Sequence, residues 1–249
     1  MNAYDGTPRL RGLEIVAGTY SNVRAETKFG HAPSLGTGEA TIWSPLGIYV
    51  YPSGATAMTV SSGSTDDAAG GTGALTARVT GLDGDWVEVK QTVTLDGRTG
   101  VSIPTALRRI YRIEVLTAGS GGKNAGKIYV GEGAISTGIP AIIYAQIDVG
   151  ENQTLMTPYT IEAGKVGYVT SIYASLGGSK DLHLKILIRE PGEVFRVKRI
   201  EHVRSTPFPL QLDLPIGPIP AQSDIELRGS VDATTIDVSA AYDIVLIDA

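Results

Sequence analysis

The chain contains no cysteine, which excludes disulfide bonds and thiolate metal sites. Bulky apolar residues are also scarce, with three Phe, three Met and two Trp among 249 residues. No stretch approaches the ~18 consecutive apolar residues of a membrane-spanning helix. Residues 1–6 show no cationic region followed by an apolar run. We therefore expect no membrane partner, no signal peptide, and synthesis in a cytoplasm.

Charge is sparse as well, since charged residues make up 19% of the chain and the formal net charge is −5. A nucleic-acid-binding protein usually presents a basic face, and the one basic cluster here is Arg196, Lys198, Arg199 and Arg204. On a strand, Arg196 and Lys198 would share one face and Arg199 would lie on the other. We interpret the cluster as a solvated strand face. If it is functional, an acidic protein partner fits better than nucleic acid.

What the chain does contain is glycine, 31 residues against a usual ~7%, together with many β-branched residues. In the run 86–95, apolar residues recur at alternate positions, and Asp96-Gly97 follows as a hairpin signal. Leu182, Leu184, Ile186 and Ile188 alternate in the same way. These patterns predict an all-β fold.

Turn residues and strand patterns divide the chain into three predicted parts. Residues 1–40 are rich in turn residues and predict an extended N-terminal arm, with a short strand near residues 10–16, ordered against a neighbouring subunit. Residues 41–137 predict a first β domain. Residues 138–249 predict a second, with turns at roughly the 8–12-residue spacing of a sandwich. The expected architecture is two β-sandwich or jelly-roll-like domains.

No residue pattern indicates a catalytic, cofactor or metal site. Asp66, Asp67, Asp83 and Asp85 lack the spacing of a calcium loop and are interpreted as turn residues. The run 119–123 lacks the spacing of a phosphate-binding loop. Gly-x-Ser-x-Gly does not occur. We therefore expect a protein that is not an enzyme and has no cofactor.

The histidines, His31, His183 and His202, are widely spaced. A hairpin centred on Pro191-Gly192 would place His183 and His202 nearly opposite each other, as half of a metal site. Because no third ligand is evident, we favour exposed polar residues or a pH-sensitive contact.

Trp86 has two interpretations. It can be a core residue at a domain interface, which we favour, or an exposed ring that stacks on a sugar.

Three stretches, residues 86–97, 109–113 and 119–130, resemble a β module of structural proteins of tailed bacteriophages. The likeness continues at residues 163–168, 188–190 and 223–228, so it spans residues 75–249. The resemblance implies a virion component, foremost a capsid decoration or cement protein, often trimeric in such systems, with the major capsid protein as partner. It implies no catalytic residues.

The leading hypothesis is thus a non-enzymatic virion protein that stabilises the head shell through subunit contacts, with Trp86, Arg196, Lys198 and Arg199 as candidate contact residues. The alternative is a carbohydrate- or receptor-binding β module of a tail or head fibre. A polysaccharide-degrading enzyme is a third reading, and fold alone does not exclude it.

Overall fold

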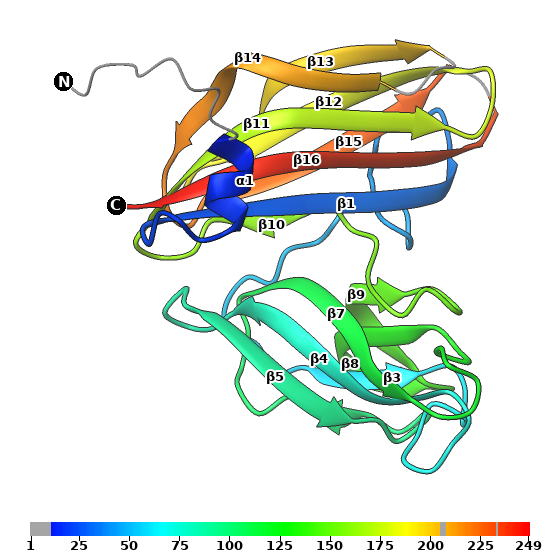
Figure 1. Ribbon diagram of the computed structural model, residues 1–249. Helices are drawn as coiled ribbons and strands as arrows, with labels where there is room; N and C mark the ends of the chain where they lie inside the picture. The colour runs from blue at the N-terminus through cyan, green and yellow to red at the C-terminus, as the bar shows by residue number, and fades with distance from the viewer. Residues whose placement is uncertain (1–10, 205–207, 233) are drawn as a thin grey trace.

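The computed structural model describes residues 11–204, 208–232 and 234–249, which form an all-β protein with four antiparallel sheets (Figure 1). The all-β class predicted from the sequence is confirmed. The described residues include one short helix, α1 (Arg11–Val16), and no helix among them has the length and apolar character needed to cross a membrane.

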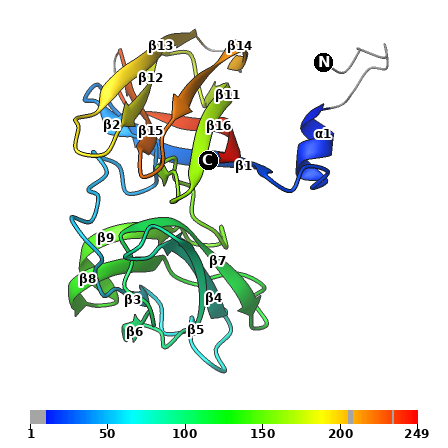
Figure 2. The same cartoon turned by 90° about the vertical axis from the view of Figure 1, so that its left-hand side faces the viewer.

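Two of the sheets enclose one core. Sheet A has the order β1–β16–β11–β14, and sheet B has the order β10–β15–β12–β13, with β2 also paired to β15. The strands are β1 (Val23–Leu35), β2 (Ala40–Thr41), β10 (Tyr159–Thr160), β11 (Lys165–Leu176), β12 (Asp181–Arg189), β13 (Arg196–Arg204), β14 (Phe208–Ile219), β15 (Asp224–Val231) and β16 (Ile236–Asp248). Figure 2 shows the two sheets as separate layers. Alternate residues of both, such as Leu184 and Ile244, are buried in one shared cluster.

The other two sheets enclose a second core. Their orders are β6–β3–β8–β9 and β5–β4–β7. The strands are β3 (Thr59–Ser62), β4 (Ala74–Leu82), β5 (Glu88–Thr94), β6 (Val101–Ser102), β7 (Arg109–Ala118), β8 (Ile128–Ser136) and β9 (Ile139–Ile147). β-Branched residues from both sheets, including Val79, Ile113 and Val130, are fully buried between them.

The chain crosses from the first core to the second between Ile42 and Trp43, and it has returned once Met156 is passed. The two crossing segments run side by side, because Trp43 and Met156 form an antiparallel bridge and Thr157 N donates to Ile42 O at 3.2 Å. Gly30 packs directly beneath them, and a Cβ there would lie 2.2 Å from Ile42 O. We call residues 43–156 the inserted unit, and residues 11–42 with 157–249 the terminal unit.

The prediction of an N-terminal arm is wrong for residues 23–35. β1 pairs with β16 from Val23 opposite Ile247 to Leu35 opposite Ile236, and Leu35 is fully buried. The sequence of this segment did not predict a strand because Lys28 and Gly30 occupy inward-facing positions, where the strand pattern requires apolar side chains. The strand predicted near residues 10–16 is the helix α1 where the structure describes it. Residues 1–10 lie outside the described residues.

The predicted division between residues 137 and 138 falls inside a hairpin. β8 and β9 pair from Ile128 opposite Ile147 to Ser136 opposite Ile139. Thr137 and Gly138 both have positive φ angles, 49° and 87°, which suits a tight two-residue turn. The relaxed hydrophobic pattern at this point therefore marks a turn, and β9 belongs to the inserted unit.

Asp67 organises the loops at the far end of the inserted unit. Its fully buried carboxylate accepts hydrogen bonds from the N–H groups of Ala74, Ala125 and Gly126, at 2.7, 2.7 and 2.8 Å, and from Ser62 Oγ at 2.6 Å. Asp83 similarly accepts from Asp85 N at 2.9 Å and Val87 N at 3.0 Å. Both side chains act as the loop-forming residues that the sequence predicted.

Replacing Asp67 by Asn should lower the free energy of unfolding by on the order of 3 kcal/mol, because an amide N–H₂ would face backbone donors that lose a charged acceptor. Urea denaturation measures the change. Asp66→Asn is the matched control, since Asp66 is exposed and should change stability by less than about 0.5 kcal/mol. Equal effects of the two substitutions would contradict this role of Asp67.

Candidate functional site at the junction of the two units

A row of guanidinium groups and aromatic rings runs across the junction. Arg109 Cζ lies 5.0 Å from the ring centre of Trp86 and 5.1 Å from that of Tyr51. Arg189 Cζ lies 4.6 Å from the ring centres of both Tyr51 and Phe195, and Arg228 Cζ lies 4.9 Å from Phe195. We call these six residues the arginine–aromatic row. Each contact is worth about 0.5–2 kcal/mol, depending on desolvation.

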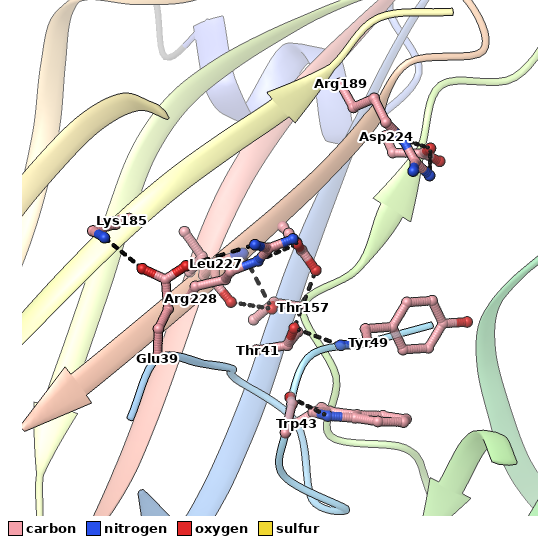
Figure 3. Close-up of polar contacts among 12 residues, drawn as sticks. Glu39, Thr41, Trp43, Tyr49, Thr157, Lys185, Arg189, Asp224, Leu227 and Arg228 are labelled. Carbon is pink, nitrogen blue, oxygen red and sulfur yellow. Dashed lines mark hydrogen bonds and ion pairs between the residues drawn. The ribbon is translucent and has the colours of Figure 1, made fainter. Parts of the chain in front are cut away.

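Asp224, the first residue of β15, binds two of the three arginines of the row. Arg109 Nε and Nη2 donate to its two carboxylate oxygens at 2.7 and 3.1 Å. Arg189 Nε and Nη2 donate to Oδ2 at 3.0 and 2.5 Å (Figure 3). Thr160 Oγ1 adds a bond at 2.6 Å. The Asp224 side chain is only 3% exposed. One buried carboxylate therefore joins an arginine of the inserted unit to an arginine of the terminal unit.

Further ion pairs lie on sheet B next to this site (Figure 3). Arg228 pairs with Glu226 and, at 3.6 Å, with Glu39, which also pairs with Lys185. Burial raises the pKa of the Glu226 carboxyl group. The hydrogen bond from Lys185 lowers the pKa of Glu39. Thr41 Oγ1 donates to Glu226 at 3.2 Å, so β2 is fixed to the same network.

Trp86 reaches the terminal unit from the loop between β4 and β5. Its φ angle is 64°, and its carbonyl oxygen accepts a hydrogen bond from Ala163 N at 2.9 Å. Its half-buried side chain packs against the core of the terminal unit, and Arg108 Cζ lies 5.2 Å from its ring centre. The structure thus places Trp86 at the junction of the two units.

A cleft of about 560 Å³ opens beside this row. Its lining includes Tyr51, Trp86, Arg108, Arg189 and Glu193. These groups donate and accept hydrogen bonds and offer ring faces, which suits a ligand rich in hydroxyl or carboxylate groups. Among the described residues, no group of three or more His, Asp or Glu side chains is arranged so that it could hold a metal ion.

The other candidate contact residues lie on β13, and they are not among the residues that line the cleft. Arg196, Lys198 and Arg199 are exposed and pair with Glu193 at 2.7 Å, Glu190 at 3.9 Å and Glu201, respectively. The expected faces are wrong, because the register with β12 shifts at this point. Arg196 and Arg199 lie opposite Ile188 and Ile186, so these two arginines share a face.

A second polar contact between the units lies around β1. Arg24 Nη2 donates to Glu162 at 2.6 Å and to Glu88 of the inserted unit at 3.4 Å. The buried ammonium group of Lys28 donates to the carbonyl oxygen of Tyr111 at 2.7 Å. Burial, and secondarily the positive charge of Arg112, lowers the pKa of Lys28 to about 7. The units are therefore joined by buried charges at two separate places.

The comparisons with known proteins are sparse. No protein-family model and no curated protein matches the chain. Among the solved structures that it resembles are three of infectious bursal disease virus. The Gt strain structure has 11% identity, covers 91% of this chain and 72% of that chain, and gives a TM-score of 0.26. The Gx strain structure has 12% identity, covers 100% of this chain and 79% of that chain, and gives a TM-score of 0.23.

A crystal structure of the VP2 subviral particle of the same virus has 14% identity, covers 91% of this chain and 72% of that chain, and gives a TM-score of 0.21. These likenesses are weak, and the functional argument therefore depends on this chain's own geometry.

Sequence reasoning missed Arg109, Arg189 and Asp224. They come from three distant segments, and no local pattern connects them. The available signal was that Arg189 and Asp224 stand at the ends of strands in which aliphatic residues recur at alternate positions.

Replacing Asp224 by Asn should lower the free energy of unfolding by about 3 kcal/mol, because it leaves the buried Arg109 and the half-buried Arg189 without their carboxylate. Urea denaturation followed by tryptophan fluorescence measures the loss. Asp237→Asn is the control: its exposed side chain pairs with His31, and such pairs contribute at most about 1 kcal/mol. An unchanged midpoint for Asp224→Asn would refute the role of Asp224.

Lys28 should make stability depend on pH. Its pKa is lowered in the folded state, so between about pH 7 and pH 10 the unfolded chain binds more protons. Stability should therefore rise with pH in this window, by up to about 1.4 kcal/mol per pH unit. Unfolding measured from about pH 7 to pH 9.5 should show this slope in the parent protein and lose it in Lys28→Met. The exposed Lys123→Met is the control; a slope retained in Lys28→Met would contradict the assignment.

Proposed function

We propose that this chain is a non-enzymatic structural protein of a virion, a capsid decoration or cement protein that self-associates on the head shell. The observation that carries the proposal is the strand order of the terminal unit. With β10 set aside, its strands can be counted from first to eighth along the chain. Sheet A then holds the first, eighth, third and sixth, and sheet B the second, seventh, fourth and fifth.

This order is that of an eight-stranded jelly roll, which recurs in viral capsid proteins and also in lectins. It supports the predicted jelly-roll sandwich for the terminal unit, with the inserted unit carried between its second and third strands. Fold alone does not fix function, so the surface has to supply the rest of the argument.

The outer face of sheet A carries an apolar hollow of about 560 Å³. Phe29, Leu155, Tyr173 and Ala241 contribute to its lining, with Glu151 among the polar residues. Phe29 and Tyr173 come from β1 and β11, on either side of Ala241 in β16. An apolar hollow on an exposed sheet face is typical of a protein-binding surface.

The helix α1 lies on the same side of the molecule. Figures 1 and 2 together show it in front of sheet A and standing away from the strands. Leu13 is 63% exposed and Val16 is 75% exposed. A helix of six residues is too short to be stable by itself. We therefore assign the hollow to α1 of a second copy, whose Leu13 and Val16 it would bury.

This arrangement also suits the charges. Glu151 at the hollow and Asp237 and Asp243 on β16 give this sheet face a negative charge, and in the sequence two arginines, Arg9 and Arg11, precede Leu13. Exchange of arms between copies builds a closed oligomer, for which the phage resemblance favours a trimer. The contact to the major capsid protein belongs to the same proposal.

The carbohydrate-binding alternative would use the junction cleft, where Trp86 and Tyr51 could contact a sugar. Both rings already lie next to guanidinium groups, so a sugar would have to displace charged neighbours to stack on those faces. We therefore favour assembly over carbohydrate binding.

Light scattering should give an oligomer for the parent chain and a folded monomer for Leu13→Asp with Val16→Asp, because charged side chains cannot enter the hollow. Ile139→Asp, at an exposed apolar position of the inserted unit (42% exposed), should leave the oligomer intact. A monomeric parent chain, or loss of the oligomer in the control alone, would refute the arm contact. The virion assignment is tested separately, by mass spectrometry of purified virions, and it fails if they lack the chain.

A further inference from the structure

His183 and His202 are direct partners across the β12–β13 pair. The centres of their rings lie 4.4 Å apart, with an angle of 69° between the ring planes. The sequence placed these residues nearly opposite each other but did not fix the register. The structure makes them immediate neighbours on the outer face of sheet B, which Figure 2 shows on the side opposite α1.

Both imidazoles are free to bind a ligand. Both residues are exposed, and neither ring has a hydrogen bond or an ion pair within the described residues. His31 differs, because its Nε2 lies 2.9 Å from Asp237 Oδ1. The chain thus holds one histidine with a carboxylate partner and two that face each other.

The charges around the pair balance. On the same face, β12 contributes Asp181 and Lys185, and β13 contributes Arg204. Arg204 pairs with Asp181 at 3.3 Å, and Lys185 pairs with Glu39. From β15, Ser230 lies opposite His183, and Arg228 lies opposite Lys185 and pairs with Glu226 and Glu39. Each neighbouring cationic side chain is paired with a carboxylate, so the charge around the two histidines does not repel a positively charged ligand.

We propose that His183 and His202 form a binding site for a divalent transition-metal ion such as Zn²⁺ or Ni²⁺. Imidazole nitrogen suits these ions, at ligand distances of about 2.0–2.1 Å. Residues directly opposite on a strand pair hold their Cβ atoms about 4.5–5.5 Å apart, and exposed rings can turn so that one nitrogen of each meets the same ion. Water occupies the remaining positions, which leaves the ion open to a further ligand. This site is independent of the proposed function.

Isothermal titration of the 249-residue protein with ZnCl₂, and separately with NiCl₂, tests the site. The expected result is one ion per chain, with affinity that falls as pH is lowered because protons compete for the imidazoles. His183→Gln and His202→Gln should each weaken binding by on the order of 10²-fold, since each removes one of two linked ligands. Both side chains are exposed, so the variants should fold normally, as circular dichroism will verify.

His31→Gln is the matched control and should bind the ion as the parent does. Imidazole NMR signals of His183 and His202, but not of His31, should shift on titration with Zn²⁺. The proposal is overturned if either single variant keeps the parent affinity, if His31→Gln alone loses it, or if binding is unaffected between neutral and acidic pH.

Discussion

At the junction cleft, one buried carboxylate joins the two units. Asp224 neutralises Arg109 from the inserted unit and Arg189 from the terminal unit, and the aromatic rings of Trp86, Tyr51 and Phe195 fill the space around these guanidinium groups. A buried guanidinium such as that of Arg109 is strongly destabilising when it loses its carboxylate partner. Asp224 thus fixes two of the arginines that line the cleft, while Trp86 is held by its hydrogen bond from Ala163 N and by Arg109 over its ring.

Local sequence patterns predicted much of the secondary structure, but little of how the strands pair or how the chain divides into units. Leu182 to Ile188 alternate because one face of β12 is buried, and that rule acts within a strand. β1 was missed because Lys28 and Gly30 take inward positions for reasons outside the strand: Lys28 donates to Tyr111, and Gly30 packs beneath the crossing segments. The division into units was missed because the ends of the insertion meet only in space.

The site was hidden for the same reason. Arg109 and Asp224 are 115 residues apart, and each looks like an ordinary end-of-strand charge in the sequence. Trp86 could be singled out as a rare residue, but the sequence placed it at the start of a strand rather than in a loop, and its neighbours could not be named. The approximate pairing of His183 with His202 was predictable because a short hairpin joins their strands, but the hairpin alone did not fix the register. The distance between residues along the sequence thus decides which parts of such a site can be predicted.

The pairing of β1 with β16 has a consequence for synthesis of the protein. These strands lie at opposite ends of the described chain, so sheet A cannot be completed until the last strand has left the ribosome. The inserted unit, in contrast, is one continuous segment with its own core and can fold earlier, since domains fold as units during synthesis. We expect the nascent chain to carry a finished inserted unit while β1 still waits for its partner. Contacts between distant segments are slow to form, and this closing step should limit the folding rate.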